Sequence, residues 1–287
     1  MQPYAAVFPN LRQPMMMCHS FRRFIASAVL VVAAQVSLAQ TPQTAQLQNY
    51  TWTELRDQIR AGKTTVIIPI GGTEQSGPFI AVGKHNVRAE YLAEKIAEKL
   101  GNALVAPVVA YVPEGSYAPP TSHMRFPGTI TIPDDVFEKM LESAANSFAV
   151  HGFRNIVFLG DHGGYQKDLK LVVAHLNKTW AGKNVKAILP PEYYGTESDG
   201  YAQILRQHGM RDDEIGTHAG VADTSLQLAV APQMVRLNQL RNAAKPGEAD
   251  GVYGGDPRRS SAELGQLGVD AIVSRTVDAI RKETVGR

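Results

Sequence analysis

The sequence predicts an α/β fold: a single layered domain with a mostly parallel central sheet flanked by helices. Short apolar, β-branched runs have the character of strands that are buried on both faces, and they occupy residues 64–70, 103–112, 130–132, 155–159 and 185–189. Segments with apolar residues at helical spacing lie between these runs. Strands that alternate with helices favour parallel pairing in one layered sheet.

The helical segments carry their own start and stop signals. Gly101 follows an amphipathic segment, Asp134 and Asp135 fall in the expected first turn of another, and Pro232 marks the end of a third. We expect helices over residues 52–61, 86–100, 136–151, 166–180, 198–208, 221–230 and 261–281.

Residues 1–39 have the pattern of a signal peptide. Arg22 and Arg23 precede an apolar core that ends in small residues before Ala39, and this core is too short to span a membrane. The alternative is a buried N-terminal helix, and the arginine pair is only a weak sign of twin-arginine export. We expect a periplasmic or secreted protein, with a linker over residues 40–50 and one catalytic domain over residues 51–287.

Composition excludes several classes of function. The 287 residues carry a net charge of +2 with both signs mixed along the chain, which gives no argument for nucleic acid or an anionic membrane surface as partner. Cys18 is the only cysteine and precedes the apolar core, so the mature chain has neither disulfides nor thiolate ligands. Any metal must therefore be held by histidine, aspartate or glutamate.

Two loops at predicted strand ends carry residues that could bind a metal. Residues 69–85, PIGGTEQSGPFIAVGKH, follow the first strand and contain Glu74 and His85. His162 lies beside Asp161 in a glycine-rich turn after another strand. Ligands bind outside the carboxyl ends of strands in open α/β sheets, and glycines let a backbone approach a ligand closely. The alternatives are a surface acid or cap for Glu74 and an ordinary turn residue for His162.

Two further loops carry polar residues. His218 and Asp223, in GTHAGVADTS, lie at the start of a predicted helix. The positively polarised start of a helix suits an anionic substrate or a developing oxyanion. The alternative is an ordinary capping turn with Thr217 as N-cap. His123 and Arg125, in a proline-rich loop, could line a pocket or lie on the surface.

Together these segments resemble the creatininase (creatinine amidohydrolase) family over residues 52–263. The family pattern GSxEQHGPHLPxGTD is similar to GGTEQSGPFIAVGKH, and YGxSxEHxxFPGT is similar to YAPPTSHMRFPGT. In the same order, NGHGGN is similar to GDHGGY, and HAGxxETS to HAGVADTS. Four ordered partial matches are more specific than any one of them.

The resemblance implies a metal site that is reduced relative to the family. The family holds two divalent ions with five side chains, and only Glu74 and His162 keep their ligand type here. His85 stands at the bridging aspartate, while Ser76 and Gly164 stand at two other ligands. Because an imidazole offers one lone pair, His85 cannot bridge two ions. We expect one metal ion held by Glu74, His85 and His162.

That ligand set suits zinc with a fourth position open for water, although manganese or iron would also fit. The resemblance implies hydrolysis of a carbon–nitrogen bond in a small amide, possibly cyclic, by a metal-bound water. His218 matches the family's catalytic histidine, and would either donate a proton to the leaving nitrogen or stabilise the oxyanion. Asp223 and Asp161 are the predicted base or orienting carboxylates.

The predicted substrate-binding residues are His123, Arg125 and Ser122. Phe79 and Ala81 replace a histidine and a proline of the family pattern, so creatinine itself is not the expected substrate. An ester or lactone is the alternative substrate on the same site, and a non-catalytic binding protein with this fold is the second hypothesis. The family resemblance also implies a homo-oligomer, a hexamer.

Overall fold

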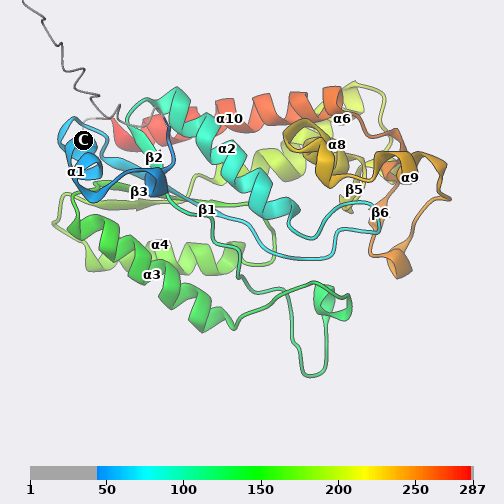
Figure 1. Ribbon diagram of the computed structural model, residues 1–287, viewed down its shortest axis with the longest axis horizontal. Coiled ribbons are helices and arrows are strands. Elements are labelled where there is room, and N and C mark those ends of the chain that lie inside the picture. The colour runs from blue at the N-terminus through cyan, green and yellow to red at the C-terminus, as the bar shows by residue number, and fades with distance from the viewer. Residues whose placement is uncertain (1–43, 286–287) are drawn as a thin grey trace, which may run out of the picture. The chain divides into compact units, whose positions relative to one another are not determined.

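The central sheet has four parallel strands in the order β2-β1-β3-β4, as the expected fold class requires (Figure 1). This computed structural model describes residues 44–285, and the described residues form one compact unit. In register, Ile67 of β1 pairs with Val105 of β2 on one side and with Val157 of β3 on the other. The strands are β1 (Thr65–Ile70), β2 (Ala103–Val105), β3 (Asn155–Gly160) and β4 (Lys186–Ile188).

Alternate side chains of each strand enter two separate cores. Ile67 and Val157 pack on one face with apolar side chains of α2 (Lys84–Leu100), α8 (Val221–Val230) and α10 (Ala262–Thr284). In Figure 1, α2 and α10 accordingly run along the same side of the sheet. Each fully buried aliphatic side chain contributes about 1.5–3 kcal/mol.

The opposite face of the sheet is covered by a second helical layer. Ile68 and Phe158 point into a core formed with α3 (Asp134–Val150) and α4 (Gln166–Thr179), and α1 (Trp52–Arg60) packs at its edge. Because both faces of the sheet are covered, its strands are apolar throughout rather than alternating.

Most predicted helices are present, and two of them, α2 and α3, each start two residues earlier than expected. The helix predicted over residues 86–100 begins at Lys84, and Gly101 ends it in a left-handed conformation with φ +80°. The earlier start matters, because it places Lys84, His85 and Arg88 together on the buried side of the first helical turns.

Two predicted strands differ from the structure. The run over residues 103–112 is a strand only in β2, because Pro107 has no N–H for the ladder, and Val109 forms only an isolated bridge with Ile70. Residues 130–132 form no strand, because the Ile130 N–H donates to the Thr73 carbonyl in a loop rather than to a strand of the sheet.

The C-terminal half is more broken than the sequence predicts. The single helix expected over residues 198–208 is divided between a π-helical turn and α6, and a two-stranded antiparallel sheet, β5 with β6, was not expected. The remaining elements are α5 (Pro191–Gly195), the π-helical turn (Thr196–Gly200), α6 (Tyr201–Gln207), α7 (Asp212–Ile215), β5 (Gly216–His218), α9 (Leu237–Asn242) and β6 (Tyr253–Gly255).

Within residues 44–285, no helix has both the length and the apolar character that a membrane span requires. The predicted signal peptide, residues 1–39, lies outside the described residues and stays a prediction.

Candidate metal centre and active site

The loop that joins β1 to α2 holds Glu74 inside the protein. The Glu74 side chain is fully buried, and its N–H donates to the Val82 carbonyl at 3.0 Å. The loop lies against the start of α2, because the Gly72 N–H donates to Asn86 Oδ1 at 2.9 Å. A side chain at Gly71 would collide with the backbone of Asn86, so this close approach requires glycine.

The two oxygens of the Glu74 carboxylate face different groups. Oε2 lies 3.1 Å from Nε2 of His123 and 3.3 Å from Nε2 of His162. Oε1 lies on the other side, where Nε2 of His85 is 2.8 Å away and Nζ of Lys84 is 3.5 Å away. Glu74 therefore separates a histidine pair from a cationic cluster.

A group of metal-ligating atoms gathers on the Oε2 side. One ligand atom each of Glu74, Glu114, His123 and His162 lies within 4.8 Å of all the others. Glu74 Oε2 and both oxygens of Glu114 are buried and accept no hydrogen bond within the described residues. Buried carboxylate oxygens that accept no hydrogen bond are rare in native proteins. A divalent cation would satisfy them, and two imidazoles with two carboxylates are a donor set that zinc or manganese accepts.

The two carboxyl groups of this ligand group are in different protonation states. Burial raises the pKa of Glu114 to about 8, and the adjacent Glu74 charge adds to the shift. Burial would also raise the pKa of Glu74, but the Lys84 ammonium and His85 hold that pKa well below its ordinary value. The Glu114 carboxyl therefore keeps a proton at neutral pH that a bound cation would displace.

Glu114 was not predicted from the sequence. It follows the second apolar run and is flanked by Pro113, and nothing in the linear pattern separates it from an ordinary loop acid. In the structure its N–H donates to Thr131 Oγ1 at 2.9 Å, which turns the carboxyl inward. Its Oε1 lies 3.7 Å from Nδ1 of His162.

The proline-rich loop brings His123 into the ligand group and leaves Ser122 and Arg125 outside it. His123, predicted to bind substrate, belongs to the ligand group. Ser122 and Arg125 occupy the exposed side of the same 3-10 turn, where the Arg125 Nε–H donates to the Ser122 carbonyl at 3.1 Å. Neither contacts Glu74 through any observed hydrogen bond or ion pair, so their substrate role stays a prediction.

His85, predicted as a ligand, lies beside the ligand group and not within it. Its Nδ1 is 2.7 Å from Asp161 Oδ2, and its Nε2 faces Glu74 Oε1. A carboxylate behind one ring nitrogen is the usual support of a metal-binding histidine. Its role as a ligand stays a prediction.

Asp161 orients other side chains. The carboxylate is fully buried and accepts hydrogen bonds from Arg88 Nε and from the Tyr193 hydroxyl, each at 2.8 Å. Burial would raise the pKa of Asp161, but the Arg88 guanidinium and His85 lower it. With these contacts in addition to His85, Asp161 is suited to holding the imidazole in place rather than to acting as a base.

Arg88 is the centre of the network behind the site. It is fully buried, and besides Asp161 its guanidinium donates to Asp223 at 2.9 Å and to Glu197 at 2.6 Å. Burial raises the pKa of Glu197 to about 8. The nearby Arg88 charge lowers this pKa, while the negative charges of Asp161 and Asp223 add to the increase.

His218 lies at the end of β5 and Asp223 in the first turn of α8. Asp223 Oδ2 accepts a hydrogen bond from the Ala219 N–H at 2.9 Å, while Nε2 of His218 lies 2.9 Å from the Gln75 carbonyl oxygen. Burial, assisted by the Lys84 charge, lowers the pKa of His218 to about 3. The imidazole is therefore neutral. Thr217 does not cap α8, since Gly220 holds the N-cap position.

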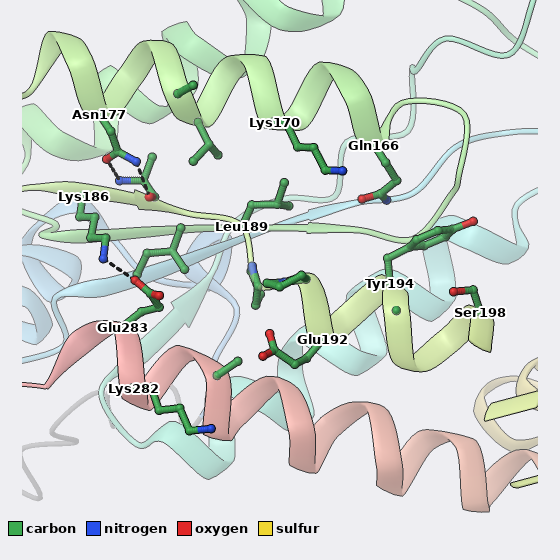
Figure 2. Close-up of a pocket in the computed structure, with 18 of the residues that line it drawn as sticks. Gln166, Lys170, Asn177, Lys186, Leu189, Glu192, Tyr194, Ser198, Lys282 and Glu283 are labelled. Atoms are coloured by element: carbon green, nitrogen blue, oxygen red, sulfur yellow. Dashed lines mark hydrogen bonds and ion pairs between the residues drawn. The ribbon is translucent and has the colours of Figure 1, made fainter. Parts of the chain in front are cut away.

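Two hollows lie near these residues. The larger, about 860 Å³, lies between α4, β4, α5 and α10, and Figure 2 shows Gln166, Glu192 and Lys282 around it. It touches the site loops only at Gly163. The smaller, about 420 Å³, reaches both His218 and Asp223. No residue of the ligand group is among those that line the smaller hollow.

Buried imidazoles and carboxylates at the carboxyl end of a parallel sheet, with a neutral histidine beside a pocket, are typical of a metal-dependent hydrolase. The chain belongs to the creatininase family: the family profile, described as creatinine amidohydrolase, matches residues 48–280. It is a metal-dependent amidohydrolase of that family, as the sequence resemblance predicts.

Known relatives differ in what they act on. Creatinine amidohydrolase of Pseudomonas putida is 26% identical over 253 residues, which cover 81% of this chain and 95% of the relative. A mycofactocin precursor peptide peptidase of Mycolicibacterium smegmatis is 28% identical, over 64% of each chain. A 3-dehydro-scyllo-inosose hydrolase of Thermotoga maritima is 29% identical over 68% of this chain and 59% of its own length.

Solved structures share the fold. A crystal structure of creatinine amidohydrolase has a TM-score of 0.72 at 22% identity and covers 86% of this chain and all of its own. A creatininase structure described as the Mn form has a TM-score of 0.71, and a mutant creatininase described as Zn–Zn type has 0.69, each at 23% identity and covering 85% of this chain and all of its own. These likenesses support the predicted layered α/β fold.

Proposed function

We propose that this protein is an exported hydrolase of carbon–nitrogen bonds in small amides, cyclic or linear, which acts at a single-metal site. The observation that carries the proposal is the set of buried carboxylate oxygens of Glu74 and Glu114 that accept no hydrogen bond and lie beside two imidazoles. Such oxygens are left in a protein interior when a cation completes their coordination.

The ion would be held by Glu74, Glu114, His123 and His162, with zinc as the proposed metal. When bound, it acts as a Lewis acid toward the scissile carbonyl and lowers the pKa of the attacking water. The creatininase structures in a Zn–Zn form and an Mn form support a divalent transition metal. His85 is the competing ligand, and variants of His85 and His123 distinguish the two assignments.

The residues around the ion have separate roles. Asp161 and Arg88 fix the His85 ring, and His85 in turn fixes one oxygen of Glu74. His218 borders the smaller hollow, and would either donate a proton to the leaving nitrogen or stabilise the developing oxyanion.

The test of this function is hydrolysis by the zinc-loaded and by the chelated protein. A panel of cyclic amides, linear amides and dipeptides is compared with matched lactones and esters, and amine release is measured directly. We expect amine release only from the loaded protein, and its loss in Glu74→Ala and His162→Ala. Lys139→Ala is the control for metal dependence, because Lys139 is an exposed residue of α3 that pairs with Asp135. Turnover confined to lactones or esters would contradict the proposed bond class.

Export is proposed from the N-terminal pattern alone. N-terminal sequencing of protein from the periplasm or medium should give a mature chain that begins near Gln40. A full-length chain confined to the cytoplasm would contradict export. The assembly proposed by family resemblance is a homo-hexamer, and the molar mass of the purified protein in solution tests it.

A further inference from the structure

The chain passes back over the site loops at residues 251–253, where β6 begins. A side chain at Gly251 would collide with Oε1 of Gln75, and a Cβ at Gly77 would lie 2.8 Å from Cγ2 of Val252. Figure 1 accordingly shows the loop between β1 and α2 reaching β6. A segment that carries no acid and no imidazole of its own therefore forms part of the wall of the site.

Tyr253 lies in this segment and faces two imidazoles. β5 and β6 pair in antiparallel register with His218 opposite Tyr253, and side chains of directly opposed residues contact one another across a sheet. The ring centroids of Tyr253 and His218 are 5.3 Å apart with the planes at 34°, and those of Tyr253 and His123 are 6.0 Å apart at 62°. Since the two imidazoles are themselves 4.6 Å apart, the three rings form one continuous surface.

Gln75 holds the two imidazoles of this ring surface in place. Its Nε2 lies 3.0 Å from Nδ1 of His123 and 3.1 Å from Nε2 of His218. Its Oε1 accepts a hydrogen bond from the Gly77 N–H at 2.9 Å, which fixes the orientation of the amide. Because Gln75 is buried and both ends of its amide are engaged, the ring surface is present before a substrate binds.

The ring surface is the side from which a substrate can reach the ligand group. The carboxylate side chains of the group are 0% exposed, whereas three imidazole side chains are each slightly exposed, at 12% for His123, 14% for His162 and 10% for His218. Neither of the two hollows is lined by a residue of the ligand group. A substrate that approaches the ligand group therefore passes over the imidazoles and the ring packed against them.

We propose that Tyr253 is a substrate-binding residue that selects amides whose acyl group is planar, such as aromatic or conjugated amides. The side chain is partly exposed, and aromatic faces favour flat partners in offset-stacked or edge-to-face contact. The Tyr253 hydroxyl forms no hydrogen bond within residues 44–285, so it can bond to the substrate. The inference rests on the proposed function and names the substrate class that the site prefers.

The experiment compares benzamide with cyclohexanecarboxamide, two amides of the same connectivity that carry a flat and a puckered ring. Dissociation constants are measured by ligand-observed nuclear magnetic resonance with zinc-loaded wild type, Tyr253→Phe, Tyr253→Leu and Trp52→Leu, and ammonia release is followed in parallel. Trp52 is an exposed aromatic residue of α1 and provides the matched control.

We expect the preference for benzamide, expressed as the ratio of the two Kd values, to fall about fivefold in Tyr253→Leu, because the stacking face is lost. Tyr253→Phe should keep this ratio while both Kd values rise about threefold, because the hydroxyl is lost. Trp52→Leu should match wild type. A merely structural role for Tyr253 would weaken the binding of both amides alike and leave the ratio unchanged.

Thermal unfolding with circular dichroism and metal analysis establish that each variant is folded and loaded. If Tyr253→Leu is not folded, Tyr253→Ile replaces it, because a β-branched residue suits a strand. An unchanged Kd ratio in the folded variant, or no binding of benzamide by wild type, would overturn the role of Tyr253 and leave metal-dependent hydrolysis standing. Unchanged Kd values in Tyr253→Phe would overturn the hydrogen bond assigned to the hydroxyl. Selective binding of benzamide without amine release from any amide would instead overturn the proposed function.

Discussion

Replacement of Glu74 by glutamine removes one negative charge from the centre of the site while preserving the shape of the side chain. Glu74 faces two imidazoles through Oε2 and a cation through Oε1, so both metal binding and the metal-free fold depend on its charge. In the metal-free protein, Lys84 keeps its closer contact with Asp223 at 2.7 Å. We therefore expect Glu74→Gln to remain folded, with a loss of up to about 3 kcal/mol.

The effect on metal binding can also be stated as a free energy. An ion that binds only the folded protein stabilises it by about 2.7 kcal/mol when the free ion is at 100 times Kd. Even the loss of an outer-shell partner of a ligand weakens metal affinity 10–100-fold. If the amide weakens binding by about 100-fold, the same ion concentration stabilises Glu74→Gln by only about 0.4 kcal/mol.

The assay is urea unfolding with and without zinc, in wild type, Glu74→Gln and the matched control Glu248→Gln, which replaces an exposed glutamate of the 3-10 turn Glu248–Asp250. Wild type and the control should gain equal stability from zinc, while Glu74→Gln gains almost none. An equal gain in all three would refute the assignment of Glu74 as a ligand and with it the physical basis of the site.

Further predictions concern the ligands, the buried acid, helix packing and the metal itself. His123→Ala and His162→Ala should each lower metal content, whereas Ser122→Ala should not, and metal analysis of the three variants decides this. Because the pKa of Glu197 is raised to about 8, the folded protein holds a proton on Glu197 between about pH 4.5 and 8 that the unfolded chain does not hold. The free energy of unfolding should therefore fall as the pH rises through this range. Glu197→Gln should reduce that dependence on pH. Gly265→Ala should lower the free energy of unfolding by about 1–3 kcal/mol, because the new Cβ would collide with the Ser225 carbonyl oxygen of α8. Gly195→Ala has open space around the new Cβ and should be neutral or stabilising. Thermal unfolding compares the two variants. Chelation should abolish amide hydrolysis, and added zinc should restore it in a standard rate assay; activity that survives chelation would contradict metal dependence.

The sequence predicts the fold well because the core elements are locally unambiguous. The run that becomes β3 is apolar throughout, and the helix predicted over residues 221–230 coincides with α8. The run beginning at Ala103 was overestimated, since periodicity does not register that Pro107 interrupts the ladder. Segments such as β6 have no apolar pattern, so they could not be recognised.

The site was only partly predictable for a similar reason. Glu74 and His162 follow strands and lie within recognisable patterns, and both reach the centre of the structure. Glu114 belongs to a loop whose path depends on contacts with Thr131, which no local pattern encodes. The sequence pattern predicts a loop at Lys84, whereas α2 begins at this residue and buries its side chain.

Anomalous diffraction from crystals of the zinc-loaded protein, recorded at the metal absorption edge, tests the single-metal site most directly. We predict one anomalous peak, coordinated by Glu74 Oε2 and flanked by His123 and His162, with no second peak between Glu74 Oε1 and Asp223, where the Lys84 ammonium lies. Two peaks that share the Glu74 carboxylate, or one peak on the Lys84 side, would contradict it.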